Sequence, residues 1–380
     1  MKWSAIRVLL SIVSENSMFR RNLILICGLL CNAPLTADAQ VARPDKRLQE
    51  KVSIQVEAKS VVELLRELGE KHKLPVDFDP SIKEEGIEGS FTLTADGLTL
   101  GSLIHLVCES ENLVTSFDKG RLFVTTQAAD SENLVVRDYP LAALGGVDPR
   151  VLSVGLVELT SGFWMDIDGE GGEIVAMTPQ ALRIRQTRAV HDELQSLFDQ
   201  IAAATGGRGR VLTAQGKAEQ AMIRKLQTPA QFSTDKTALP ELLDQLLQKN
   251  GIPFWIDQTA LADEGIDWTK LESTVAVKKL SPAARLDAIV TEHQLAWRFA
   301  DEVVQITTEV KSNERLFTRV YDIRRSNQPG PVLAQQLMQN PDLGPWVVND
   351  GEGGGILPVG TLLLVRQSAK VHARIAKLLN

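Results

Sequence analysis

The chain has 380 residues, of which 44% are hydrophobic and 23% are charged. This is the composition of an ordinary globular protein of roughly two to four domains. The formal net charge is −7. Proteins that bind nucleic acid present clusters of Lys and Arg to its phosphates, so we expect no nucleic-acid partner for a chain this acidic.

The N-terminus has the three parts of a secretory signal peptide. Arg20 and Arg21 precede an apolar run at 23–30, and the small-x-small sequence at 37–39 is typical of a cleavage site. We therefore predict that 1–39 is a signal peptide and that the mature protein is exported to the periplasm or the cell envelope. A retained membrane anchor is the alternative, but the apolar run is short for a bilayer core of about 30 Å. After cleavage we expect no membrane span.

Met18 is an alternative start, because 18–39 is itself a well-proportioned signal. The segment 1–39 carries four basic and two acidic residues, so its removal changes the net charge from −7 to −9. Cys108 would be the one cysteine left, and we therefore expect no intrachain disulfide. Its apolar, helix-like surroundings predict a buried thiol.

Most of the chain consists of two copies of one sequence unit. Residues 52–201 recur about 180 positions later as 230–379. The matching residues include Tyr139 and Tyr321, Trp164 and Trp346, Arg185 and Arg366, and His191 and His372. A duplicated unit is typical of a modular protein. We therefore expect each unit to act as a module, rather than one active site to be split across the chain.

The first half of each copy predicts a small α+β domain. Apolar and polar residues alternate over 52–56, as in a half-buried strand, and an apolar stripe over 61–68 predicts an amphipathic helix. Thr99 and Ser281 are capping residues before a second helix. A glycine-ended turn at 118–120 predicts a closing hairpin. The predicted order is β-α-β-(β)-α-β-β.

The second half of each copy predicts another small domain. Tyr139 lies in a predicted strand, and 164–167 and 174–176 are predicted to form a hairpin around an Asp-Gly turn. A third strand at 182–184 precedes a final helix over 190–201. The predicted fold is thus α+β, with two tandem copies of a pair of small helix-backed sheet domains. The predicted division is a signal peptide at 1–39, a lead-in at 40–51, a first pair at 52–130 and 131–203, a partly helical linker at 204–227, and a second pair at 228–310 and 311–380.

The first domain of each pair resembles the short N-terminal domain shared by secretins and TonB-dependent receptors. The matching segments are 52–56, 64–68, 76–79 and the hairpin at 113–126. The second domain is similar to the small N-type domains of secretins, from Tyr139 through the strand and helix at 182–197. The resemblance implies a periplasmic interaction module without catalysis. Because the sequence ends at Asn380, after the last helix, we expect no pore-forming barrel of its own.

Recurring tryptophans and arginines are candidate recognition residues. Trp164 and Trp346 each follow a glycine-containing segment; exposed, they would anchor a partner, and buried, they would fill a core, which we favour. Arg185 and Arg366 could hold a carboxylate or form a structural salt bridge with the neighbouring acidic turn.

His191 and His372 are the remaining recognition candidates. Each lies beside an apolar stripe at a helix start, and we favour a half-exposed helix histidine over a metal or proton-transfer role. The acids Asp166, Asp168 and Glu170 evoke a calcium loop, but their spacing departs from the EF-hand pattern. We therefore predict no metal, no cofactor and no catalytic residues.

These patterns predict a non-enzymatic protein-interaction or scaffold protein that binds through sheet edges or by packing of like domains. A protein partner or self-association is expected, and cell-wall contact is compatible. One alternative is a cell-wall ligand-binding protein or hydrolase with a cleft between the copies, where His191, His372 or the acidic turns would meet. The other alternative is an adaptor of a secretion or uptake complex.

Overall fold

The computed structural model describes residues 45–144, 147–206, 217–231, 236–274, 279–326, 328–350 and 353–379. The predicted signal peptide at 1–39 and residues 207–216 of the predicted linker therefore lie outside the described residues, as do Gly351 and Glu352. Among the residues that are described, no helix is long and apolar enough to cross a membrane.

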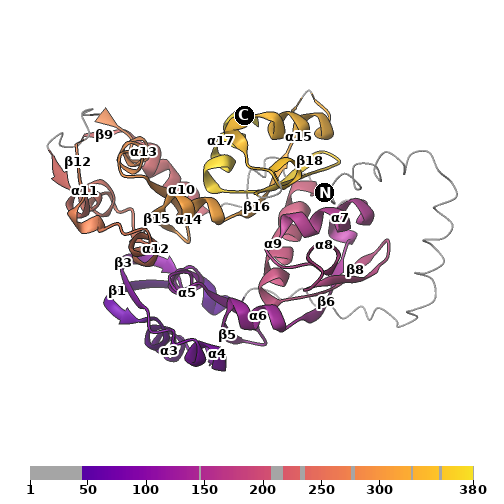
Figure 1. The fold of residues 1–380 in the computed structure, drawn as a ribbon, viewed down its shortest axis with the longest axis horizontal. Helices are drawn as coiled ribbons and strands as arrows, with labels where there is room; N and C mark the ends of the chain where they lie inside the picture. The colour runs from indigo at the N-terminus through magenta and orange to yellow at the C-terminus, as the bar shows by residue number, and fades with distance from the viewer. Residues whose placement is uncertain are drawn as a thin grey trace. The chain divides into compact units, whose positions relative to one another are not determined.

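The first part of copy one contains two small sheets (Figure 1). Strands β1 and β3 pair antiparallel, and a second sheet has the order β2-β5-β4. The elements are η1 (Lys46–Gln49), β1 (Lys51–Ser60), α3 (Val61–Lys71), β2 (Val76–Phe78), α4 (Pro80–Glu84), β3 (Ser90–Thr99), α5 (Leu100–Glu109), β4 (Leu113–Asp118), β5 (Arg121–Thr126) and α6 (Gln127–Glu132).

The second part of copy one is a three-stranded sheet of order β6-β8-β7 with helices on one face. Its elements are β6 (Val135–Pro140), η2 (Ala142–Leu144), α7 (Pro149–Leu159), α8 (Met165–Asp168), β7 (Glu173–Met177), β8 (Ala181–Gln186) and α9 (Arg188–Thr205). Strand β8 is central and antiparallel to both neighbours.

Copy two has three-stranded sheets of the corresponding orders, β11-β15-β14 and β16-β18-β17. Its first part comprises α10 (Lys217–Gln227), β9 (Ala230–Gln231), β10 (Thr237–Ala238), α11 (Leu239–Leu246), η3 (Gln248–Asn250), β11 (Phe254–Ile256), α12 (Gln258–Asp263), η4 (Trp268–Lys270), β12 (Glu272–Ser273), β13 (Lys279–Leu280), α13 (Pro282–Glu292), β14 (Leu295–Ala300), β15 (Val303–Thr308) and α14 (Glu309–Glu314). Its second part comprises β16 (Phe317–Asp322), α15 (Gly330–Gln339), η5 (Pro341–Leu343), α16 (Val347–Asp350), β17 (Gly355–Val359), β18 (Leu362–Gln367) and α17 (Ala369–Leu379). The predicted α+β class with several small helix-backed sheets is confirmed.

Local sequence signals explain many of these elements. The predicted stripe of α3 is buried, including Val61 and Leu65 at 1% exposure each. The Thr99 side chain accepts a hydrogen bond from the Ser102 amide at the start of α5, and Ser281 does the same for Ala284 at the start of α13. Cys108 is buried in α5, and burial raises the pKa of its thiol, so the prediction of a buried thiol is confirmed.

Two of the four hydrophobic clusters are built from both copies. The cluster of the first part of copy one takes in Trp255 and Val303 from copy two. The Trp255 ring stacks on Phe91 with their centroids 6.3 Å apart. The cluster around α7 and α9 takes in four side chains of the second sheet in copy two, namely Val320, Val359, Leu362 and Leu364. The copies therefore share hydrophobic cores and do not form independent domains.

The second parts of the two copies form alternating layers of sheet and helix. Helix α7 packs on β17 and β18, and α9 packs on β16, so helices of copy one cover a sheet of copy two. That sheet is covered on its other face by its own helices α15 and α17. The layer order is β6-β8-β7, then α7 with α9, then β16-β18-β17, then α15 with α17, and it can be followed in Figure 1.

One predicted element is wrong, and several helices were not predicted, of which α7 and α15 are the longest. The segment 164–167 is not a hairpin strand, because Met165–Asp168 forms the short helix α8 and Trp164 makes only an isolated parallel bridge with Gly172. Helices α7 and α15 lie where no element was assigned. Helix α7 is sandwiched between two sheets, so it lacks the single apolar stripe by which an amphipathic surface helix is recognised.

Candidate functional site

The two recurring tryptophans lie in the core. Trp164 is 2% exposed and Trp346 is 1% exposed. The indole Nε1 of Trp164 donates to Thr160 Oγ1 at 3.0 Å. The sequence left two roles open for these side chains, filling a core or anchoring a partner. The structure places both side chains in the core.

The recurring Asp-Gly string terminates a tight loop beside these tryptophans. Asp168 Oδ2 accepts a hydrogen bond from the Trp164 amide at 2.7 Å, and Asp350 Oδ2 accepts one from the Trp346 amide at 2.8 Å. Gly171 has a φ of 92°, and a Cβ there would lie 2.3 Å from the Phe163 carbonyl oxygen. In copy one the string is thus explained by this hydrogen bond, which closes the turn, and by the close backbone approach at Gly171.

The two recurring histidines are buried, so the expectation of half-exposed histidines is wrong. His191 and His372 have 0% exposure. Tyr139 Oη lies 2.7 Å from His191 Nδ1, and His191 Nε2 lies 2.9 Å from the Val135 carbonyl oxygen. The carbonyl can only accept, so Nε2 carries the proton and Nδ1 accepts from the tyrosine hydroxyl.

The same arrangement recurs in copy two. Tyr321 Oη lies 2.8 Å from His372 Nδ1, and His372 Nε2 lies 2.8 Å from the Phe317 carbonyl oxygen. Desolvation by burial lowers the pKa of His191 to about 4 and that of His372 to about 3. Both rings are therefore neutral near pH 7, and each ties the first strand of its sheet to its final helix.

The recurring arginines occupy two different environments. Arg185 forms an ion pair with Glu173 on the neighbouring strand, with Nε 3.1 Å from Oε1, and both side chains are partly exposed. Arg366 is half-buried, and desolvation lowers its pKa against an opposing effect of Glu193 in copy one. Glu193 in turn accepts a hydrogen bond from the Ser161 amide at 2.9 Å. Arg366 thus lies at the contact between copies and Arg185 does not.

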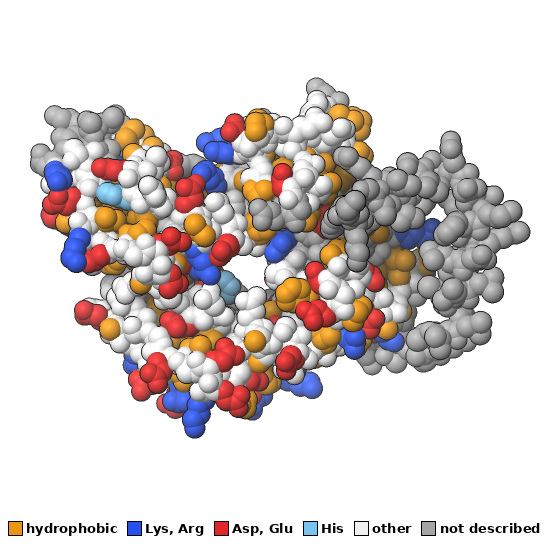
Figure 2. Space-filling view, in the orientation of Figure 1, with side chains coloured by type: hydrophobic (Ala, Val, Ile, Leu, Met, Phe, Trp, Pro, Cys, Tyr) orange, Lys and Arg blue, Asp and Glu red, His pale blue; other side chains and the backbone are white. Residues whose placement is uncertain are grey.

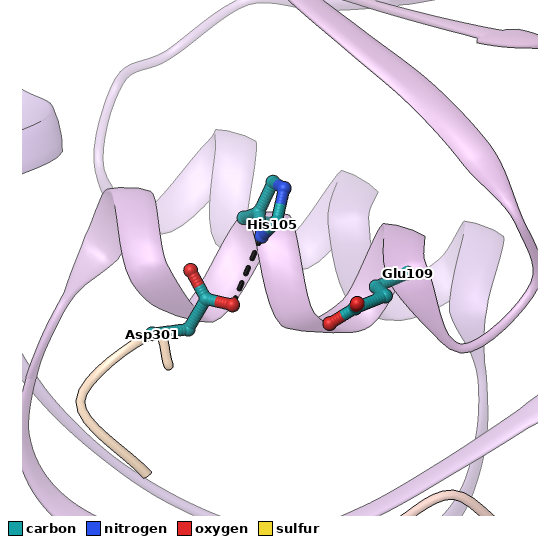
Figure 3. A group of neighbouring side chains, drawn as sticks. All are labelled: His105, Glu109 and Asp301. Carbon is teal, nitrogen blue, oxygen red and sulfur yellow. Dashed lines mark ion pairs between the residues drawn. The ribbon is translucent and has the colours of Figure 1, made fainter. Parts of the chain in front are cut away.

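The structure also reveals a polar contact between copies that the sequence analysis missed. The two-residue turn between β14 and β15 consists of Asp301 and Glu302, both with positive φ. This turn places both carboxylates against α5 of copy one. Asp301 Oδ2 lies 3.0 Å from His105 Nδ1, as Figure 3 shows. Glu302 Oε2 accepts the Thr99 amide at the start of α5, at 2.5 Å.

Glu109 completes this cluster one helical turn after His105. Its Oε1 binds the guanidinium of Arg298, and it also lies 3.2 Å from Nε of Arg315. Arg315 further binds Asp257 Oδ2 at 3.0 Å. The charge of Asp301 is the main cause that raises the pKa of His105 to about 9. Burial alone would raise the pKa of Asp301, but the nearby His105 and Arg298 lower it.

His105, Glu109 and Asp301 are also the kind of group that could bind a metal ion. One ligand atom from each lies within 4.8 Å of the others. However, two guanidinium groups already contact Glu109, and a divalent cation would be repelled by both of them. The arrangement is therefore that of an ion-pair network which holds α5 against the β14–β15 hairpin.

Two cavities are relevant to the expected cleft between copies. One of about 170 Å³ lies beside this network and is lined by Asn112, Asp257 and Arg315, among others. The other, of about 320 Å³, lies within copy two beside Lys370 and Arg374. Small-molecule sites usually measure about 300–1,000 Å³. Neither His191 nor His372 lines either cavity.

Exposed apolar side chains are concentrated in one of the four sheet domains. Of the twelve large hydrophobic side chains found exposed among the described residues, eight lie within 136–177. Five of these lie in one segment of the chain, which we call the 163–177 patch, namely Phe163, Met165, Ile167, Val175 and Met177, at 42–55% exposure. On the face shown in Figure 2, acidic and basic side chains are interspersed, with apolar groups between them.

No protein-family model and no curated protein matches the chain. Among solved structures it is similar to the Klebsiella pneumoniae type II secretion system outer membrane complex of PulD, PulS and the PulC HR domain, at 14% identity and a TM-score of 0.24, over 86% of this chain and 49% of that chain. This chain therefore spans about half the length of that one.

Two further solved structures are similar to the chain. The enterotoxigenic Escherichia coli GspC–GspD complex has 12% identity and a TM-score of 0.17, over 40% of this chain and 99% of that one. The N-terminal domain of the secretin XcpQ from Pseudomonas aeruginosa has 9% identity and a TM-score of 0.17, over 87% and 97%. At these TM-scores the similarity assigns no function or partner to this chain. The expected resemblance to TonB-dependent receptors stays a prediction.

Proposed function

We propose that the chain is a non-enzymatic protein-interaction protein of the bacterial cell envelope and that it binds a partner protein through the 163–177 patch. The observation that carries this proposal is the concentration of exposed apolar side chains in that segment. Exposed apolar side chains that gather in one region of a protein mark interaction sites, whereas scattered ones do not.

The backbone beside the patch supports binding by strand addition. Strand β7 lies at the edge of its sheet and, in the described part of the chain, pairs only with β8. Val175 and Met177 of this strand are 42% and 44% exposed. A partner strand could satisfy the open main-chain groups of β7 while its side chains cover these apolar residues.

The histidines support a role without catalysis. His191 and His372 each use both ring nitrogens within their own domain, so they do not meet in a shared cleft. The envelope location rests on the signal-like sequence at 1–39, and cell fractionation with an antibody against the folded domains would test it.

Site-specific photo-crosslinking tests the binding proposal. A photoreactive residue placed at Phe163 or Met177 should give a discrete covalent adduct with another protein in the native envelope. The matched control is Val348, which is 51% exposed in α16, the corresponding short helix of copy two, and should give none. Met177→Lys should remove the adduct formed from position 163. Equal adducts from 163 and 348, or no adduct from 163 and 177, would contradict the proposal.

A further inference from the structure

The contact between the second parts of the copies joins two unlike surfaces. One is the outer side of helices α7 and α9, and the other is the outer face of the β16-β18-β17 sheet. Close approach is needed here, because a Cβ on Gly155 would lie 2.3 Å from Leu357 Cδ2 and a Cβ on Gly355 would lie 2.7 Å from the Glu158 carbonyl oxygen.

A contact between unlike surfaces leaves one surface of each kind free. Among the described residues, the surfaces left uncovered are the outer face of the β6-β8-β7 sheet in copy one and the outer side of α15 and α17 in copy two. If these matched the buried surfaces, a second molecule could add to either end and the chain would assemble into open-ended rows. The residues at the corresponding positions decide whether it can.

The free sheet face carries charge where the buried face is apolar. In copy two, Val320 pairs across the strands with Leu364, and both are buried at 0% exposure. In copy one, the corresponding cross-strand pair is Asp138 with Arg183. Arg183 Nε and Nη2 bind the two carboxylate oxygens of Asp138 at 2.7 and 2.9 Å. Covering this pair with apolar helices would remove water from two charges at a cost of several kcal/mol per ion.

Two further positions block the same contact. Gly355, the first residue of β17, pairs with Arg366, whereas Glu173, the first residue of β7, pairs with Arg185. Gly155 is the seventh residue of α7, whereas the seventh residue of α15 is Gln336, an exposed side chain. In the free sheet the place of Leu357 is taken by Ala176, which pairs with Arg183 as Leu357 pairs with Leu364, so a docked Gln336 would bury its polar amide against an apolar side chain.

We propose that the two second domains stack on each other within one chain and that neither outer surface of this stack binds a second molecule of the same chain. Stacking therefore ends at the pair, which we call self-terminating. This differs from partner binding at the 163–177 patch, which uses a strand edge rather than a sheet face. Separate measurements test the two proposals: crosslinked adducts at defined residues test partner binding, and the molecular mass in solution tests the stacking.

Three variants of the full chain test the proposal by sedimentation velocity. The sheet variant carries Asp138→Val, Arg183→Leu and Glu173→Gly, and the helix variant carries Gln336→Gly. Each alone frees only one surface and should keep the wild-type mass, while an equimolar mixture of the two should form a complex of twice that mass. The combined variant should form longer species that grow with concentration.

Two results would overturn the proposal. The first is a wild-type protein whose mass rises without limit as its concentration increases. The second is a mixture of the folded sheet and helix variants that shows no complex at any soluble concentration. If the sheet variant does not fold, Val320→Asp with Leu364→Arg, which copies the charged face into the buried contact, decides instead. Amide hydrogen exchange in α7 and β17 should then accelerate, and unchanged protection would refute the proposal.

Discussion

At the scale of single residues, the buried Tyr–His pairs make stability sensitive to acid. The pKa of His191 is lowered to about 4 and that of His372 to about 3, whereas an exposed histidine titrates near about 6.5. Between these values the unfolded chain binds protons that the folded chain does not. The free energy of unfolding should therefore fall as pH falls from about 6.5 to about 4, by about 1.4 kcal/mol per pH unit for each histidine.

Urea unfolding at a series of pH values from 7 to 4.5 measures this slope. His372→Gln removes one of the two titrating groups, so its slope should be shallower than that of the wild type. His105→Gln is the control, because the pKa of His105 is raised to about 9 and its contribution is lost only as pH rises above about 6.5. Equal acid slopes for the wild type and His372→Gln would show that the buried histidine is not kept neutral.

At the scale of elements, strand β17 depends on a glycine where a neighbouring helix crosses it. A Cβ on Gly355 would lie 2.7 Å from the carbonyl oxygen of Glu158, a backbone atom of α7 that cannot rotate away. We expect Gly355→Ala to destabilise the fold by about 1–3 kcal/mol, the usual cost of overpacking. Thermal unfolding measures this effect. Glu173→Ala, at the corresponding first position of β7, should change the stability little, and equal effects of the two would contradict the close-contact argument.

Helices α3, α5 and α13 were predictable from the sequence, and helix α7 was not. The stripe of α3 and the caps Thr99 and Ser281 gave the right helices, because local pattern and local chemistry decide them. The sequence pattern did not predict helix α7, because this helix packs on two sheets and shows no polar face. The segment 164–167 was misassigned because the hydrogen bond from the Trp164 amide to Asp168 closes a helical turn instead of a hairpin.

At the scale of the whole molecule, the ion-pair network on Glu109 should hold the first parts of the two copies together. Glu109→Gln would leave Arg298 and Arg315, which are 10% and 12% exposed, without their shared carboxylate. We expect a loss of about 2–4 kcal/mol, because breaking this largely buried pair leaves Arg298 without a bound carboxylate, while Arg315 keeps Asp257. Amide hydrogen exchange in α5 and β14, together with urea unfolding, would detect the loss.

Glu67→Gln is the matched control for that change. Glu67 pairs with Lys59 on the surface, and its side chain is 60% exposed. Such pairs contribute about 0–1 kcal/mol. If both substitutions had the same small effect, the network would be a surface feature of no structural consequence.

Comparing the sequences of the two copies could not predict the contacts between them, and the reason is physical. A residue recurs when both copies use it internally, as Tyr139 and Tyr321 do. A residue that joins unlike surfaces has no reason to recur, and neither His105 nor Asp301 does. The spacing of His105 and Glu109 places them on one helix face, but their partners lie more than 180 positions away in the sequence. Only the folded chain brings them together.

The apolar outer face of the β16-β18-β17 sheet has a consequence for how the protein is made. Synthesis runs from the N-terminus, so helices α7 and α9 leave the ribosome before Val320, Leu362 and Leu364 exist. The two helices that cover the apolar sheet face are therefore made before that face exists. Reversing the order of the two halves in the gene would expose that apolar sheet face to water before α7 and α9 are made. We expect such a chain to bind chaperones and to aggregate more.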